Sequence, residues 1–264
     1  MLRFYLDVAR TAFKRQLIYR WANAAGLLTN IFFGAIFSYV IIALFHARPA
    51  VAGYSVQDTL RYTWLLQAMI MVVLPFGWYD LMLTIRSGEV VTDLSKPCDF
   101  YTYWFSREMG RNGYYLLFRG VPTYLAGMVL FGIGAPGEWR SWLGYALALP
   151  LGAMLGIAYR FLYNLMAFWT TEARALAVLA QIVAFFFTGS YVPIPFFPAW
   201  LRVIADWLPF AGLMNLPAEI FLGKVSGPLV WFELGRQVLW LVALTLVVHL
   251  LTAVAFRRVT VQGG

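Results

Sequence analysis

Long runs without strongly polar residues divide the chain into predicted membrane-spanning helices. The first run, 21–45, has 25 residues without a charge, and a helix needs about 20 to cross the hydrocarbon core of a bilayer. Five further runs are predominantly apolar. They are 62–85, 120–137, 142–169, 175–201 and 237–256. The pattern therefore predicts an all-α integral membrane protein with six transmembrane helices in a single domain, 1–264.

Residues 1–20 precede the first span and have the spacing of an amphipathic helix. Apolar residues recur every three or four positions, and a polar line runs beside them. The apolar positions are Leu2, Leu6, Ala9, Phe13 and Leu17, and the polar positions are Arg3, Asp7, Arg10 and Lys14. Such a helix lies in the membrane interface with its cations on the lipid headgroups. We therefore expect an N-terminal interfacial helix here rather than another span.

Two connections are longer than a helical hairpin requires. The cytoplasmic connection, 86–113, mixes charges with aromatic residues, and the outer connection, 189–228, has two short apolar pieces, 199–207 and 216–222. Each piece is too short to cross a bilayer. We interpret the outer connection as re-entrant helices, which a membrane tolerates only where protein or water satisfies the backbone. An ordinary surface loop is the alternative.

The composition favours a bilayer over a soluble core. Hydrophobic residues make up 62% of the chain and charged residues 12%, against about 25% charged residues in soluble domains. Lipid must therefore cover much of the apolar surface. The net charge of +8 is typical of loops that meet an anionic leaflet. A nucleic-acid partner is not expected, because too little solvated chain remains for a basic binding face.

The basic residues gather on one side of the predicted topology. The side of the N-terminus holds Arg3, Arg10, Lys14, Arg15, Arg20, Arg86, Lys96, Arg107, Arg111, Arg174, Arg257 and Arg258. The opposite side holds Arg48, Arg61, Arg140, Arg202 and Lys224. Because Lys and Arg are enriched in cytoplasmic loops, we expect both termini in the cytoplasm. An even number of spans agrees with this orientation.

Catalytic and nucleotide-binding motifs are missing from the sequence. It has no G-x-x-x-x-G-K-[ST] phosphate loop, no HExxH and no G-x-S-x-G. The single Cys98 and two distant histidines give no metal-ligand spacing. We expect neither cofactor, metal nor enzymatic activity on this chain. One alternative is a membrane-embedded enzyme that uses Ser190 or His249, which would need a base within reach of the nucleophile. Another is an ATP-independent channel or scaffold subunit.

Charged residues inside or at the ends of spans are further candidates, because such charges are costly in lipid. Asp80 and Arg160 fall near the cytoplasmic halves of their helices, and Glu233 and Arg236 can pair on one face of the last span. We expect these four residues to line a translocation path or to fix helix contacts. Snorkelling to the cytoplasmic interface is an equal alternative for Arg119 and Arg160. The short side chain of Asp80 favours an interior position.

The order of these features resembles the short six-span subgroup of the type-2 ATP-binding-cassette (ABC-2) transporter permeases. The resemblance covers essentially the whole chain and rests on several short segments. They are Ile85-Arg86-Ser87-Gly88-Glu89 with Leu94-Ser95-Lys96-Pro97, Ala167-Phe168-Trp169 with Glu172, Gly189-Ser190-Tyr191-Val192-Pro193, Phe196-Phe197-Pro198, Leu208-Pro209-Phe210, Pro217, Leu222-Gly223, Arg257-Arg258 and Gly263-Gly264. Each segment alone is a weak signal, and their order carries the resemblance.

The resemblance implies a permease subunit of an exporter in the cytoplasmic membrane of a prokaryote. Two separate cassette ATPase subunits would bind ATP and Mg, and a second permease chain, identical or a homologous sister, would face this one among the membrane lipids. The coupling helix would use Ser87, Gly88, Glu89, Asp93, Leu94, Lys96 and Pro97. The outer re-entrant cap would use Ser190, Pro193, Pro195, Pro198, Pro209 and Pro217. Short outer loops and bulky apolar spans suit an amphipathic or lipid-like cargo.

Overall fold

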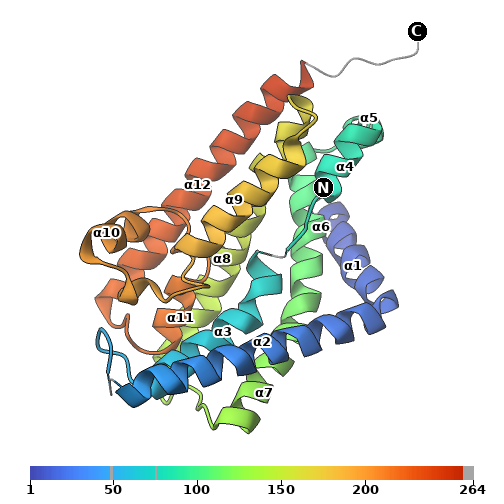
Figure 1. Ribbon diagram of the computed structural model, residues 1–264. Helices are drawn as coiled ribbons and strands as arrows, with labels where there is room; N and C mark the ends of the chain where they lie inside the picture. The colour runs from blue at the N-terminus through green and yellow to red at the C-terminus, as the bar shows by residue number, and fades with distance from the viewer. Residues whose placement is uncertain (48–49, 75, 258–264) are drawn as a thin grey trace.

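The computed structural model describes residues 1–47, 50–74 and 76–257, and this part of the chain is helical without a β-strand (Figure 1). In chain order the elements are α1 Leu2–Ile18, α2 Arg20–Ala47, α3 Val56–Val73, α4 Asp80–Ser87, α5 Val90–Leu94, α6 Phe100–Tyr115, the π-helical turn η1 Leu116–Gly120, α7 Val121–Phe131, α8 Trp139–Leu165, the 3-10 turn η2 Met166–Phe168, α9 Ala173–Phe187, the 3-10 turn η3 Ile194–Phe196, α10 Ala199–Trp207, α11 Asn215–Phe221 and α12 Pro228–Phe256. Arg48, Arg258, Gly263 and Gly264, which the sequence analysis used, lie outside the described residues.

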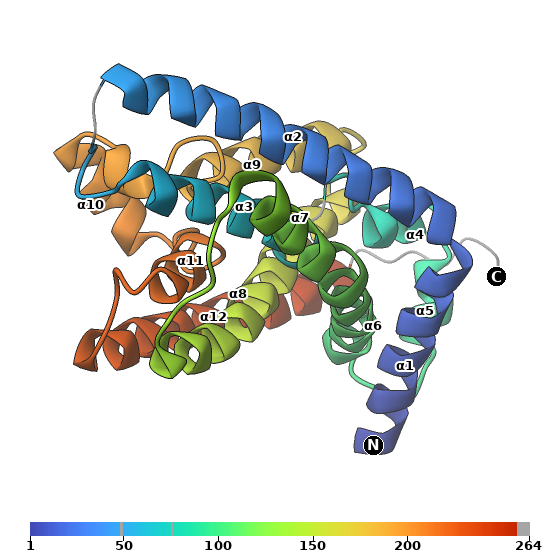
Figure 2. The same ribbon diagram turned by 90° about the horizontal axis from the view of Figure 1, so that it is seen from below.

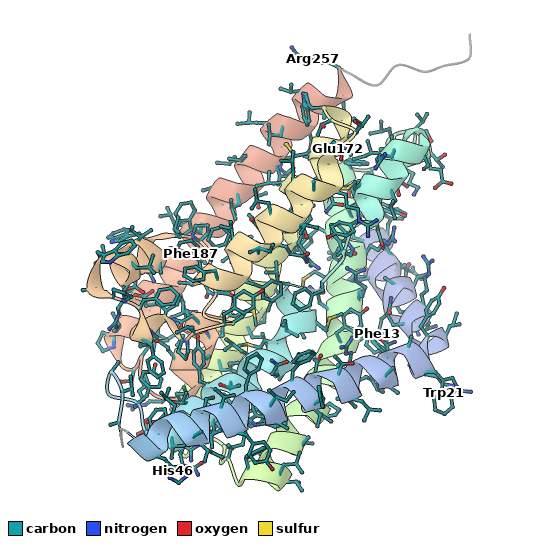
Figure 3. All side chains as sticks on the ribbon, viewed as in Figure 1. Phe13, Trp21, His46, Glu172, Phe187 and Arg257 are labelled. Carbon is teal, nitrogen blue, oxygen red and sulfur yellow. The ribbon has the colours of Figure 1, made fainter. Side chains whose placement is uncertain are left out.

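The helices give the molecule two distinct ends. Figure 1 places α5 and the C-terminal end of α12 at one end, which we call the α5 end, and α10 with the start of α12 at the other, which we call the α10 end. Figure 3 shows Glu172 and Arg257 near the α5 end, whereas His46 lies far from them. The turn before α9 and the end of α12 therefore face the same side, as the predicted topology requires.

Three helices among the described residues, α2, α8 and α12, are long and apolar enough to cross a membrane, and α9 is a shorter apolar helix. α8 lies centrally and packs against α3, α6, α9, α11 and α12. Two glycines permit this close packing. A Cβ atom at Gly152 would overlap the carbonyl oxygen of Leu213, and one at Gly156 would overlap that of Val73. Small residues allow helix backbones in membranes to approach in this way.

The second and third predicted spans differ from the observed helices. The continuous span 62–85 is wrong, because α3 ends at Val73 and α4 begins at Asp80. Gly77 lies between them with φ +67°, a left-handed conformation that does not continue a helix. The predicted span 120–137 is wrong at both ends. The continuous helix α6–η1–α7 begins at Phe100, in a polar stretch that an apolar pattern does not detect, and it ends before Gly132, whose φ is +62°.

The other predicted elements lie close to observed helices. α2 contains the run 21–45, α8 contains most of 142–169, and α12 contains 237–256. α12 begins at Pro228, earlier than predicted. Proline is compatible with this position because the first turn of a helix tolerates a residue without an N–H group. The run 175–201 contains most of α9 and continues into a non-helical stretch. The short apolar pieces of the outer connection correspond to α10 and α11.

α1 packs along α6. A Cβ atom at Gly110 would overlap the carbonyl oxygen of Ala9, and the Phe13 ring makes edge contacts with the rings of Tyr114 and Phe118. Three other members of the predicted apolar stripe, Leu2, Leu6 and Leu17, are exposed. Figure 2 shows the chain turning sharply from α1 into α2. The part of the stripe that contains Ala9 and Phe13 thus packs on α6, and its three leucines remain uncovered by the described residues.

Candidate functional site

The turn between α4 and α5 is exposed at the α5 end of the molecule. α4 ends at Ser87 and is followed by Gly88, whose φ of +80° lies in the left-handed region, so the chain leaves α4 and enters α5 within two residues. Ser87, Gly88 and Glu89 are all exposed. A Cβ atom at Gly88 would have open space around it, so glycine is required here by the backbone conformation alone.

Val90 anchors α5 to the rest of the molecule. Its side chain is only 3% exposed and belongs to an apolar cluster shared with α4, α6, α8 and α12. The buried members of this cluster are Trp78, Leu81, Val90, Phe100, Tyr101, Trp104, Phe161, Leu165 and Val248. Close-packed side chains transmit a displacement rather than absorb it. α5 is therefore packed against the long helices through this cluster.

The structure divides the seven residues of the predicted coupling segment into two groups. Ser87, Gly88, Glu89 and Pro97 are exposed, whereas Asp93, Leu94 and Lys96 are partly buried. Lys96 Nζ lies 2.5 Å from Asp93 Oδ1 and 3.9 Å from the centre of the Tyr103 ring. Burial lowers the pKa of Lys96, but its interactions with Asp93 and Tyr103 outweigh burial and raise this pKa overall. The partly buried group holds the segment in shape, and the exposed group remains free for a partner.

Sequence reasoning missed part of the outward side of α5. Val91, Thr92 and Ser95 are exposed there, and their spacing places them on one side of a helix. Val91 is apolar and 40% exposed. We call the outward surface formed by Glu89, Val91, Thr92 and Ser95 the α5 face. A helix as short as α5 gives no recognisable periodicity, so the sequence held no clear signal for this face.

Charged side chains from α4, α6 and α8 meet close to the same end. Arg160 Nη1 lies 3.7 Å from Glu108 Oε2, and these side chains are 0% and 1% exposed. Glu108 also pairs with Arg111. Asp80 Oδ2 lies 2.9 Å from Arg107 Nη2 and 3.7 Å from Arg111 Nη1. We call these five residues, Asp80, Arg107, Glu108, Arg111 and Arg160, the charge cluster.

The structure corrects two sequence-based expectations about charged residues. Snorkelling is wrong for both arginines, because Arg160 is fully buried and Arg119 is only 7% exposed. The guanidinium of Arg119 packs against Gly26 and donates a hydrogen bond to Asn30 Oδ1 at 3.2 Å. The interior position expected for Asp80 is also wrong, because its side chain is 42% exposed and lies at the edge of the cluster.

Glu108 is the cluster member that sequence reasoning did not single out. It lies in the polar half of the α6–η1–α7 helix, outside the apolar runs that defined the predicted spans. Its three-residue spacing from Arg111 was the available signal, since such pairs meet on one face of a helix. The contact with Arg160 joins residues 52 positions apart and needs the tertiary fold.

Polar contacts tie α3 and its lead-in to the 189–228 segment at the α10 end. Tyr62 Oη donates to Asn215 Oδ1 at 2.8 Å, Tyr54 Oη donates to Glu219 Oε1 at 3.1 Å, and Lys224 Nζ lies 2.9 Å from Asp58 Oδ2. Tyr62 Oη also lies 3.4 Å from the carbonyl oxygen of Gly189. α3 is therefore fixed to this segment at one end, and its other end leads to α4 and α5.

Glu233 and Arg236 form an ion pair on one face of α12, with 2.5 Å between Oε2 and Nη2. Both line a pocket of about 290 Å³ at the α10 end, together with Arg202, Asp206 and Glu219. The structure thus brings the pair next to the 189–228 segment and places it far from the charge cluster. A role in the translocation path stays a prediction.

The prolines of the 189–228 segment mark the boundaries of its short helices. Pro193 and Pro198 precede η3 and α10, Pro195 lies in η3, Pro209 follows α10, and Pro217 lies in the first turn of α11. Proline fixes φ and removes a donor, so it suits helix starts and turns. The re-entrant character of these helices stays a prediction.

Ser190 and His249 lie apart in the structure. Ser190 Oγ is 2.8 Å from Thr188 Oγ1, in the segment tied to α3 at the α10 end. His249 lies in the C-terminal half of α12, where its Nε2 is 4.0 Å from Asp99 Oδ2 and its Nδ1 is 2.8 Å from the carbonyl oxygen of Thr245. The two residues therefore do not form a nucleophile and base pair.

Glu219→Gln is expected to reduce the pH dependence of stability. Burial raises the pKa of Glu219 above its ordinary 4.5, and hydrogen bonds from Tyr54 and Asn215 offset this only in part. Because this pKa is higher in the folded than in the unfolded chain, the contribution of Glu219 to stability is complete below about pH 4.5 and is lost as the pH rises through the folded-state pKa. The measurement is the thermal unfolding midpoint in detergent between about pH 4 and pH 7.

Between these pH values the midpoint of the unchanged protein should fall, and Glu219→Gln should remove part of that fall. Glu138→Gln is the matched control, because Glu138 is exposed before α8. A Glu219→Gln protein whose midpoint falls as steeply as that of the unchanged protein would show that the Glu219 carboxyl does not titrate differently on folding.

Comparison with known proteins places the chain in a family. Residues 30–263 match a family model described as ABC-2 family transporter protein. No curated protein and no solved structure matches the chain. The matched range contains the α5 face, the charge cluster and the 189–228 segment, whereas α1 precedes it. The chain therefore belongs to the ABC-2 family of transporter proteins.

Proposed function

We propose that this chain is the transmembrane permease subunit of an ABC exporter in which a separate subunit hydrolyses ATP. Membership of the ABC-2 family supports a permease that works with an ATPase subunit. The sequence adds that no phosphate-binding loop for ATP is present on this chain. ATP and Mg²⁺ would then be bound by the partner, and this chain would convert the partner's movement into transport.

The proposed topology has six spans, formed by α2, α3, the α6–η1–α7 helix, α8, α9 and α12. The lengths and apolar character of α2, α8 and α12 support it. Both termini then lie on the cytoplasmic side, at the α5 end, in the membrane of a prokaryotic cell. α1 lies in the cytoplasmic interface, and α10 with α11 re-enters from the outer side. The excess of Lys and Arg on the side of the N-terminus favours this orientation.

The observation that carries the proposal is the two-sided character of α5. Its outward face is exposed, and Val90 on its inward side is buried in the cluster shared with α6, α8 and α12. A partner that binds the α5 face would therefore move these helices as packed bodies. Two ATPase subunits, one beneath each permease chain, and a second permease, identical or a sister, complete the proposed transporter.

A pocket between α2, α3 and the 189–228 segment supports an amphipathic or lipid-like cargo. Its volume is about 230 Å³, and its lining includes the apolar residues Phe37, Ile41 and Leu66 together with the hydroxyls of Thr59 and Thr63. Ligand pockets typically combine an apolar lining with a few polar groups in this way. The pocket lies beside the contacts that tie α3 to the 189–228 segment, so a movement of α3 would change its shape.

The double variant Glu89→Arg with Val91→Asp is expected to uncouple the ATPase. These changes reverse the charge and remove the apolar side chain of the α5 face but leave the buried anchor Val90 in place. Loss of a central interface residue costs about 2 kcal/mol or more. Co-purification of the ATPase and the stimulation of its activity by the permease should therefore each fall by about tenfold or more.

Glu172→Arg is the matched control, because Glu172 is exposed at the same end but outside the α5 face. The control should retain both co-purification and stimulation. If the double variant recovers as much ATPase as the unchanged permease and stimulates it as strongly, the α5 face is not the coupling surface.

A further inference from the structure

A groove of about 460 Å³ lies between α1, α4 and α6. Its charged lining residues are Asp7 and Arg15 from α1, Asp80 from α4, and Arg107, Glu108 and Arg111 from α6. Phe4 and Val8 add apolar surface along α1. The groove therefore carries charged groups on a largely apolar lining, and four residues of the charge cluster form one wall.

Four members of the charge cluster line the groove, and the charges of Arg107 and Arg111 balance those of Asp80 and Glu108. Arg111 Nε is buried without a hydrogen-bond acceptor in the part of the chain that the structure describes, and Arg15 on the α1 wall forms no ion pair there. Buried donors without acceptors are costly. Guanidinium groups pair well with phosphate oxygens, so a phosphate group in the groove would supply acceptors for Arg15 and Arg111.

The same wall also has an unused acceptor. Glu108 Oε1 is buried and has no hydrogen-bond donor among the described residues. A ligand that fits this wall therefore brings oxygen atoms for the arginines and a hydroxyl or amine for Glu108. Inorganic phosphate monoanion and a hydroxyl-bearing phosphodiester both meet this requirement, and the setting of the groove distinguishes them.

The α1 wall points to a lipid. Asp7 and Arg15 are exposed and form no ion pair within the described residues. The exposed Leu2, Leu6 and Leu17 of α1 suit the acyl boundary of a bilayer. In the proposed topology, on which this inference rests, the groove lies at the depth of the lipid headgroups, with the apolar residues of α1 beside it.

We propose that this groove binds the headgroup of an anionic, hydroxyl-bearing phospholipid such as phosphatidylglycerol. The phosphate lies against Arg15, Arg107 and Arg111, and a headgroup hydroxyl donates to Glu108. The bound lipid joins α1 to α4 and α6. It thereby stabilises α4 and α6, against which the inward side of α5 packs through Val90.

The test uses the purified full chain in detergent without any ATPase. Thermal unfolding and native mass spectrometry are recorded with added phosphatidylglycerol, phosphatidylcholine or inorganic phosphate. Phosphatidylglycerol should raise the unfolding midpoint more than the other two and should be retained as a bound lipid. Arg15→Gln should weaken its apparent affinity by about tenfold, since one charge-assisted contact to phosphate is lost. Arg15 has no partner to lose among the described residues, so this variant should fold.

Arg10→Gln is the control for general attraction between α1 and anionic lipid, because Arg10 is exposed on α1 but does not line the groove. Equal stabilisation by phosphatidylglycerol and phosphatidylcholine would overturn the proposal, and so would equal weakening by Arg15→Gln and Arg10→Gln. Stabilisation by inorganic phosphate to the same extent as by phosphatidylglycerol would overturn the assignment to a lipid. The binding is measured on the permease alone, so failure of ATPase coupling at the α5 face is a separate result.

Discussion

Replacing Glu108 by leucine should lower the free energy of unfolding by about 3–5 kcal/mol, the usual cost of removing one partner of a buried ion pair. Glu108 is 1% exposed and interacts with Arg111 and with the fully buried Arg160. Without it, the charge cluster changes from a net charge of +1 to +2, and the fully buried Arg160 loses its carboxylate partner. The measurement is unfolding in detergent by heat or denaturant, together with the yield of folded protein.

A compensating variant separates the charge effect from a loss of packing. In Glu108→Met with Arg160→Met the net charge of the cluster returns to +1, and apolar side chains fill the same space. Such replacements of buried pairs are often neutral or stabilising. The double variant should therefore be clearly more stable than Glu108→Leu. A Glu108→Leu protein as stable as the exposed control Glu172→Leu would contradict a buried charge cluster.

Gly156→Leu is expected to separate α8 from α3 and to cost about 3 kcal/mol of stability or prevent folding. Even a Cβ atom at this position would overlap the carbonyl oxygen of Val73. Overpacking of a tight contact usually costs about 1–3 kcal/mol, and a backbone carbonyl cannot move aside as a flexible side chain can. The measurement is the fraction of folded protein by size-exclusion chromatography and the thermal unfolding midpoint.

Gly235→Leu is the matched control for this prediction, because Gly235 is also helical but has open space around its Cβ position. It should retain stability or gain slightly, since leucine is the better helix former. If Gly156→Leu is as stable as Gly235→Leu, α3 and α8 do not approach as closely as the structure describes.

The apolar runs predicted the long helices because a bilayer imposes a simple rule on sequence. α2 and α12 lie in runs with few or no charges, and length alone marks them as candidate spans. The same rule failed at the break between α3 and α4, where the left-handed Gly77 interrupts an apolar stretch. It also failed for α6, whose polar residues face α1 and the charge cluster rather than lipid.

The fold divides the predicted coupling segment into exposed and partly buried residues, and its coupling role stays a prediction. The order of short motifs indicated the segment that contains α4 and α5, but it did not separate the exposed Glu89 from the paired Asp93 and Lys96. That separation depends on which side chains of this short segment pack inward, and the sequence alone does not give this. Glu108 and Arg160 lie 52 positions apart, and no local pattern predicts that they meet.

Site-specific cross-linking tests the central claim, that the α5 face contacts the ATPase, most directly. The native Cys98 is first replaced by serine, and single cysteines are introduced as Thr92→Cys on the α5 face and Arg140→Cys at the first turn of α8. Both positions are exposed, and each variant is co-expressed with the ATPase and treated with a short thiol-to-amine cross-linker. A covalent product with the ATPase from Thr92→Cys but not from Arg140→Cys is the predicted result. A product from Arg140→Cys, or none from Thr92→Cys while the ATPase remains bound, would contradict it.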